Sequence, residues 1–139
     1  MRQAAAAALG QFGDPRAVGP FLAAVKDQDW DVRIVVATAL AKMGHDEGDR
    51  VLLHALKHES SGKRWRAASS LGEVNHPRFL EPLIVALQDY NDSVRSQAAA
   101  NLGKQRDPRA REALRAVAAN ESEYRWVREA AEKALREMG

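Results

Sequence analysis

The clearest potential for chemistry lies in two histidines four positions apart, His54 and His58, with Glu59 directly after the second. On a helix this spacing places both imidazoles on one face, where they could ligate zinc or iron. Both positions fall on the polar side of the helix expected over residues 46–58. Because polar helix faces are normally solvated, we interpret the two histidines as an exposed pair and predict no metal site.

A second group of possible ligands lies in one loop and comprises His45, Asp46, Glu47 and Asp49. Its spacing matches no calcium-binding loop, and carboxylates are expected near a helix start because of the helix dipole. The chain has no cysteine, which excludes disulfides, thiolate metal sites and a cysteine nucleophile. It also lacks a Ser-His-Asp order, a phosphate-binding glycine loop, a dinucleotide fingerprint and an HExxH motif. We therefore expect neither an enzyme nor a cofactor.

The charge balance gives little support to nucleic-acid or membrane binding. Lysine and arginine number 21 against 19 acidic residues, a net charge of +2. No apolar run approaches the roughly 18 residues that a membrane span needs, and the first residues do not open a signal peptide. We expect a soluble, cytoplasmic protein.

An arginine recurs every 31 residues along the chain, and each one is followed seven residues later by a leucine. The last step is 33 residues, which indicates a two-residue insertion before the final helix. Prolines at Pro15, Pro77 and Pro108 have the same period. Shared periodicity in several columns predicts a repeat protein with a 31-residue unit. The repeated arginines are Arg2, Arg33, Arg64, Arg95 and Arg128.

Each repeat divides into two helical segments, here named A and B. The A segments open on a proline, as at Pro15, because proline at the first helical position lacks only a donor that would be unpaired there. Apolar residues at helical spacing give each segment a buried stripe, and glycines such as Gly44 and Gly103 are expected to end the B segments. The sequence thus predicts an all-α fold with helices over 1–12 (B), 15–26 (A), 31–43 (B), 46–58 (A), 62–74 (B), 77–88 (A), 92–104 (B), 108–119 (A) and 124–138 (B).

The pattern formed by residues 14–18, Val32-Arg33 and Ala39-Leu40 resembles the HEAT-like repeats of phycobilisome lyases, over essentially the whole chain. The resemblance implies a single domain over 1–139, built as a right-handed α-α superhelical solenoid of about four and a half repeats. It also implies that A helices form the convex side and B helices the concave side. The five repeated arginines would then bind acidic or carbonyl groups in the turns and form a structural ladder.

The chain departs from this repeat pattern at its start and in its second repeat. The first helix has no A partner, which is expected either of a fragment of a longer array or of a chain that covers this end by self-association. Asp46-Glu47-Gly48 stands where other repeats have Asp-Pro-Arg, and Lys63 replaces the usual valine before Arg64. We expect the helix after His45 to begin late for this reason.

One HEAT-like family, deoxyhypusine hydroxylase, binds iron through His-Glu pairs placed directly after the Val-Arg of several B helices. His58-Glu59 lies outside that register. The comparison therefore implies no iron site in this chain. The positions that match the ligand pairs are Gln3, Ile34, Trp65, Ser96 and Glu129.

The best functional signal is the position of the large aromatic residues. All three tryptophans and both tyrosines fall in A-to-B turns or in the first turn of a B helix, where stacked repeats would align them along one edge. Tryptophan and tyrosine are enriched at binding hot spots, although packing against the neighbouring repeat is an equally good explanation. These residues are Trp30, Trp65, Tyr90, Tyr124 and Trp126.

The B helices also predict a binding face. If Val32, Val36 and Leu40 point inward, helical geometry places Ile34 and Thr38 on the opposite side, together with the equivalent Trp65 and Ser69 of the next repeat. Ile34 and Trp65 are too apolar for an idle surface, so we expect them to anchor a partner.

These observations favour a non-catalytic scaffold that presents its concave face and aromatic edge to another protein. One alternative, suggested by the repeat family alone, is a bilin-lyase-like subunit that handles a tetrapyrrole on a phycobiliprotein. Another is a nucleic-acid-binding domain, which we consider unlikely because Glu112 interrupts its basic residues and the concave face alternates in sign. Those basic residues are Arg106, Arg109, Arg111 and Arg115.

Overall fold

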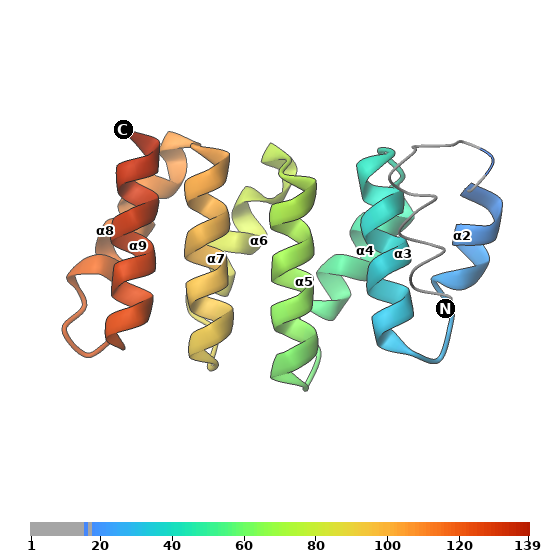
Figure 1. Cartoon of the computed structure of the whole chain (residues 1–139), viewed down its shortest axis with the longest axis horizontal. Coiled ribbons are helices and arrows are strands. Elements are labelled where there is room, and N and C mark those ends of the chain that lie inside the picture. Colours follow the sequence, from blue (N-terminus) through green and yellow to red (C-terminus); the bar gives the residue numbers. More distant parts are fainter. Residues whose placement is uncertain (1–15, 17) are drawn as a thin grey trace. The chain divides into compact units, whose positions relative to one another are not determined.

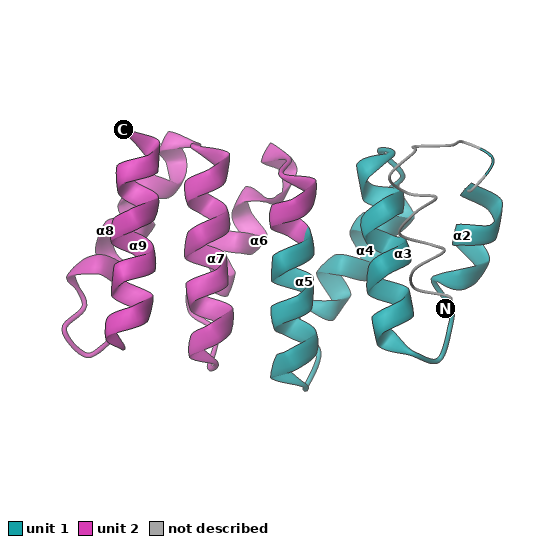
Figure 2. Ribbon diagram, viewed as in Figure 1, with its two compact units in different colours: residues 1–70 teal, residues 71–139 magenta. Residues whose placement is uncertain are grey.

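The chain folds into a succession of helices. The computed structural model describes residues 16 and 18–139, and over these residues it contains eight α-helices and no strand. The prediction of an all-α fold is therefore confirmed for the described part of the chain. The helices group into two compact units, residues 1–70 and 71–139, and the boundary lies within α5 (Ser61–Val74) (Figure 2).

Unit 1 is organised around α3 (Trp30–Lys42), which packs against both α2 (Val18–Ala24) and α4 (Asp46–Ala55) (Figure 1). The Asp29 side chain caps α3 by accepting a hydrogen bond from the backbone N–H of Asp31 at 2.8 Å. The apolar stripes of α2 and α3 meet in one core, as their spacing predicts. Its buried members are Phe21, Val25, Val32, Val36, Ala39 and Leu40.

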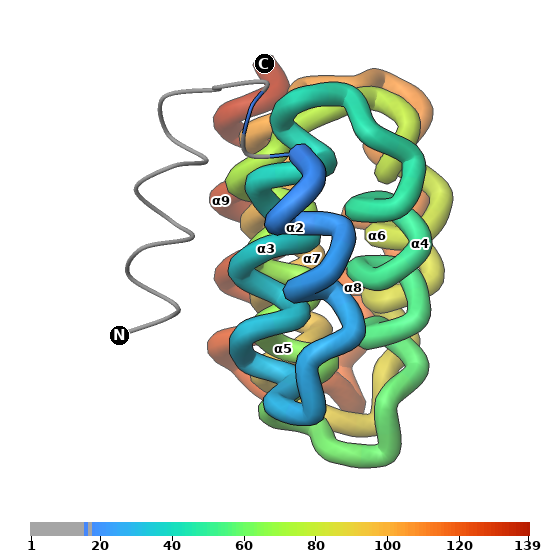
Figure 3. Tube along the Cα trace, turned by 90° about the vertical axis from the view of Figure 1, so that its right-hand side faces the viewer, coloured from blue at the N-terminus to red at the C-terminus, as the bar shows by residue number. Residues whose placement is uncertain are grey.

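Unit 2 contains two helix pairs arranged in two layers. The first pair is α6 (Leu80–Ala86) and α7 (Asp92–Gln105), and the second is α8 (Arg111–Ala119) and α9 (Arg125–Met138). Helix α7 packs against α6 and α9, and α8 packs against α9. Within this unit α7 and α9 lie side by side in one layer, with α6 and α8 in the other (Figure 3). Each A helix therefore lies against the B helix that follows it.

The A helices of unit 2 begin with a short 3-10 turn at the predicted prolines. These turns are η2 (Pro77–Phe79) and η3 (Pro108–Ala110), which lead into α6 and α8. The His76 side chain accepts from the N–H of Arg78, and an aspartate does the same before Pro108. Helix α4 lacks the proline but still begins at Asp46, because His45 caps it through Nδ1. The late start expected for this helix is therefore wrong.

The glycines near the ends of the B helices have two different roles. Gly44 follows α3 with φ of +78°, a left-handed conformation that glycine adopts without strain, as predicted. Gly103, by contrast, lies inside α7, which continues to Gln105. A Cβ on Gly103 would lie 2.7 Å from the Ala134 Cα atom, so this glycine permits close approach of α7 and α9. Its predicted role as a helix end is wrong.

The predicted boundaries agree with the described helices to within a few residues. The helix expected over 1–12 lies outside the described residues, whereas those from 15–26 onward correspond to α2 through α9. No helix in the described ranges is long and apolar enough to span a bilayer. The 31-residue period and the right-handed superhelix remain predictions.

Candidate functional site

The repeated arginines lie at the A-to-B turns and bind the backbone there. Arg64 Nη1 donates to the carbonyl oxygen six residues before it at 2.9 Å, and Arg95 Nη1 makes the equivalent bond at 2.7 Å. Arg33 donates through Nε to the carbonyl of Asp27. Each guanidinium therefore binds a carbonyl of the turn three residues beyond the end of the preceding A helix, which ties the start of the B helix to that turn.

The same turns contain a second repeated feature that sequence analysis missed. In each turn one side chain accepts a hydrogen bond from the backbone N–H two residues later, at 2.9 to 3.0 Å. This arrangement stabilises a tight turn before the next helix. The four accepting residues are 31 positions apart in the sequence, which could have revealed them. Their spacing is hard to recognise because aspartate, histidine and asparagine all fill this position. The acceptors are Asp27, His58, Asp89 and Asn120.

The common pattern is shown by three of the five repeated arginines. The first, Arg2, lies outside the described residues. Arg128, which follows the two-residue insertion, has a buried Nε without a hydrogen-bond partner. The longer turn before α9 therefore changes the geometry that the other arginines share.

Arg95 also reaches the next repeat. Its Nε and Nη2 each donate to one carboxylate oxygen of Glu123 at 2.8 Å, a bidentate pair that is largely shielded from water. Burial alone would raise the pKa of Glu123, but hydrogen bonds from Arg95 and from the Tyr124 N–H hold that pKa below its ordinary value. The pair therefore joins the two turns of unit 2 as ions.

A comparable contact joins the first turn of α3 to the first two turns of α5 within unit 1. Asp31 accepts from Lys63 at 2.8 Å and from Arg66 at 2.9 Å. The hydrogen bond from Lys63 is the main cause that lowers the pKa of Asp31. Lys63, which departs from the usual valine of the repeat, thus supplies an inter-repeat ion pair.

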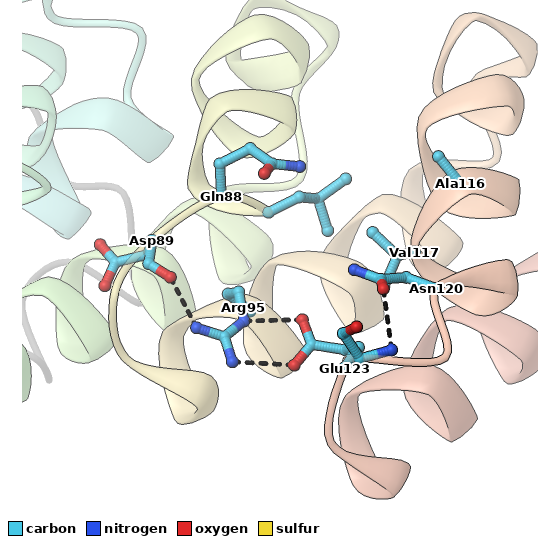
Figure 4. Close-up of a pocket in the computed structure, with 9 residues that line it drawn as sticks. Gln88, Asp89, Arg95, Ala116, Val117, Asn120 and Glu123 are labelled. Carbon is cyan, nitrogen blue, oxygen red and sulfur yellow. Dashed lines mark hydrogen bonds and ion pairs between the residues drawn. The ribbon is translucent and has the colours of Figure 1, made fainter.

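A cavity of 430 Å³ opens between the two A-to-B turns of unit 2 (Figure 4). Arg95 lies at its edge with its donors already engaged by Glu123 and by the Asp89 carbonyl. The remaining polar lining consists mostly of neutral amides and a hydroxyl, so the cavity offers little to attract an anion. Its lining residues are Leu87, Gln88, Asp89, Arg95, Ala116, Val117, Asn120, Ser122 and Glu123.

Trp30 is half-buried in unit 1. Its ring makes edge contacts with His54 and His58 at centroid distances of 5.6 and 5.2 Å, and Arg33 stacks over it at 4.7 Å. The two histidines, interpreted above as a solvated pair, flank this indole ring, with His54 exposed and His58 half-buried. No cluster of three or more metal-ligating side chains occurs in the part of the chain that the structure describes.

The predicted anchor on the B-helix face needs correction. Ile34 is only 1% exposed and Thr38 only 6%, so neither presents a surface to a partner. The reason is that α3 is buried on nearly every side, from Val36 through Ala41 without interruption. Thr38 satisfies its hydroxyl by donating to the Ile34 carbonyl at 2.7 Å. Ser69 is half-buried, and Trp65 alone of these four positions is exposed.

In unit 2 the structure brings together two of the predicted aromatic residues. Tyr124 and Trp126 stack with ring centroids 4.6 Å apart and planes 9° from parallel. They remain 54% and 51% exposed, and Tyr90 in the preceding turn is fully exposed. The Trp126 indole N–H donates to Asp92 at 2.6 Å, which ties the stack to the start of α7. We name these four residues the aromatic turn surface.

Two of the four arginines considered for nucleic-acid binding already bind other groups of the protein. Arg109 pairs with Asp107 at 2.7 Å, and Arg111 Nη1 donates to the Gly139 carbonyl at 3.0 Å. These contacts leave fewer guanidinium donors to meet phosphates than the sequence suggests.

The fold is similar to that of a known enzyme. The structure of human deoxyhypusine hydroxylase in complex with glycerol aligns with a TM-score of 0.60 and 21% identity, over 98% of this chain and 67% of that chain. At this identity the likeness shows the fold alone. It nevertheless overturns the expectation that the chain is not an enzyme, because a protein with this fold is an enzyme. The fold alone therefore does not decide whether a chain is catalytic.

Sequence comparison identifies the family. No curated protein matches the chain. The family model for HEAT repeats matches residues 1–63 and 49–136, and so covers nearly the whole sequence. Such repeats are stacked helix pairs, which agrees with the paired A and B helices of each unit. The chain belongs to the HEAT repeat family.

Proposed function

We propose that this HEAT-repeat chain is a scaffold that binds another protein through the aromatic turn surface of unit 2. The observation that supports the proposal is the exposed stack of Tyr124 and Trp126, with the exposed Tyr90 in the neighbouring turn. Isolated exposed apolar side chains are normal on protein surfaces. A stacked pair held by a hydrogen bond to Asp92 is a more specific arrangement.

The rigidity of this surface favours binding. The stack and the indole hydrogen bond fix both rings before a partner arrives, so little side-chain entropy would be lost on association. Tyrosine and tryptophan supply a large contact area with few rotatable bonds, which is why they are enriched at interface hot spots. The cavity beside Arg95 lies between the same two turns and could receive a side chain of the partner.

The experiment uses the full chain to capture partners from a lysate, followed by direct binding of the purified partner. The double variant Tyr124→Ala/Trp126→Ala is expected to lose about tenfold or more in affinity, as is typical of hot-spot truncation. Val85→Ala is the control, since Val85 is an exposed apolar residue of α6 in the same unit that lies outside this surface. Equal affinity of the double variant and the wild type would refute the proposal.

A further inference from the structure

The aromatic turn surface lies in an acidic part of unit 2. The two turns that build it, residues 88–95 and 120–126, carry four carboxylates and two arginines, a net charge of −2. The arginines are both engaged, Arg95 by Glu123 at 2.8 Å and Arg125 by Glu129 at 3.4 Å. A partner that approaches these turns therefore meets a negative potential and few available cations.

The stacked rings add a second preference for positive charge. An indole or phenol face carries partial negative charge, and it attracts a guanidinium or ammonium placed above it. Trp126 and Tyr124 each remain about half exposed although they cover one another, so ring surface is available outside the stack. Asp92 holds the indole N–H and adds a carboxylate directly beside the ring.

We infer that the aromatic turn surface recognises a basic segment of its partner, with an arginine or lysine side chain over the Tyr124–Trp126 stack and close to Asp92. This inference rests on the protein-binding function proposed above and specifies the chemistry of the partner. The surface disfavours nucleic acid, because phosphates would face a net negative charge. It also disfavours a wholly apolar partner, which would bury the Asp92 carboxylate without a counter-charge.

The probe is a short peptide of alternating glycine and arginine, compared with peptides in which glutamine or glutamate replaces arginine. Binding is followed by NMR at the Trp126 indole N–H, assigned by its loss in Trp126→Phe. We expect the arginine peptide to shift this signal and the glutamate peptide to leave it unchanged. The double variant Tyr124→Ala/Trp126→Ala is expected to lose about fivefold in affinity for the arginine peptide, and Val85→Ala to bind like the wild type.

Asp92→Asn provides a sharper test, because asparagine can still accept the indole hydrogen bond while the charge is lost. We expect this variant to keep the ring stack and to bind the arginine peptide about threefold more weakly at low ionic strength. Unchanged affinity in Asp92→Asn, or equal binding of the glutamate and arginine peptides, would overturn the inference. A mass increase in light scattering that Tyr124→Ala/Trp126→Ala abolishes would also overturn it, since the occupant would then be a second copy.

Failure of this inference and failure of the proposed function give different results. If a purified partner depends on Tyr124 and Trp126 but is not displaced by the arginine peptide, the surface binds protein without a basic segment. If that partner binds the double variant as well as the wild type, the proposed function fails whatever the peptides do.

Discussion

Replacing Glu123 with glutamine is expected to destabilise unit 2, because it removes a charge from the shielded pair with Arg95 while side-chain size is retained. In the wild type, two guanidinium nitrogens donate to the carboxylate oxygens at 2.8 Å each. After the change, the glutamine side-chain oxygen can still accept a hydrogen bond from Arg95. The glutamine NH₂ group, however, would face the second donor of the Arg95 guanidinium, and two donors cannot pair. The carbonyls of Asp89 and Tyr90 would still accept from Arg95 Nη1, but one of the two donors that faced the carboxylate would be left without an acceptor.

The expected loss follows from the burial of the pair. The Arg95 and Glu123 side chains are 14% and 10% exposed, well below a typical surface ion pair. Exposed pairs contribute up to about 1 kcal/mol, whereas breaking a fully buried pair costs about 3–5 kcal/mol. Hydrogen bonds to charged groups contribute about 1.5–3 kcal/mol, so we expect a loss of about 2 kcal/mol. For a chain of this size, that corresponds to a fall in Tm of about 6–10 °C.

The assay is urea unfolding monitored by circular dichroism, with scanning calorimetry as a second probe. Glu129→Gln is the matched control, because its ion pair with Arg125 lies in the same region but is far more exposed. This control is expected to lose at most about 0.5 kcal/mol. A double-mutant cycle with Arg95→Gln would isolate the coupling between Arg95 and Glu123. If Glu123→Gln costs no more than Glu129→Gln, the argument from burial is refuted.

Three further changes test the same structural reasoning. Acid is expected to destabilise both units, because folding lowers the pKa of Glu123 in unit 2 and of Asp31 in unit 1. The two carboxylates stabilise the fold above their unfolded-state pKa values near 4, and this contribution is lost as the pH falls through their folded-state pKa values. Urea titrations at about pH 6 and pH 3 measure this, and a stability that does not fall contradicts it. His76→Asp is expected to raise stability by about 0.5 kcal/mol in thermal melting, because aspartate is a better helix cap, and no gain would argue against the cap. Gly48→Ala is expected to cost about 1–3 kcal/mol, since the new Cβ would lie 2.5 Å from the Ala37 carbonyl oxygen, and an unchanged Tm in calorimetry would show that α3 and α4 can separate.

Local signals in the sequence predicted the helix boundaries well, because the atoms that fix a boundary lie within a few residues of it. A proline after a capping residue began the A helices at Pro77 and Pro108. A capping side chain can also act without proline, as His45 does before α4, and this was missed because histidine is an uncommon cap. The long-range contact of Arg95 with Glu123 left no comparable signal in the sequence, since the position 28 residues after a repeated arginine holds three different residue types, in Ser61, Asp92 and Glu123.

The predicted binding face failed because the sequence of α3 was read as amphipathic. Between Arg33 and Lys42 there is no charged residue, and a helix that is apolar on all sides is buried on all sides. Helix α9 shows the opposite case, with charges on most of its circumference and a narrow buried stripe of Val127, Ala131 and Ala134. The side of a helix opposite its buried stripe can therefore be predicted to be exposed only where polar residues occupy that side.

The two-residue insertion explains why the candidate surface lies in unit 2. From Asn120 to the start of α9 at Arg125 is five residues, whereas the equivalent step from Asp89 to the start of α7 is three. Within the longer turn lie Glu123, which pairs with Arg95, and Tyr124, which stacks on Trp126. An irregular step in an otherwise regular repeat thus supplies both the ion pair that joins the turns and half of the exposed stack. Loops tolerate such insertions because their backbone lies at the surface, and binding residues accumulate there for the same reason. In this chain the departure from the repeat, rather than the repeat itself, distinguishes the proposed binding surface from the other turns.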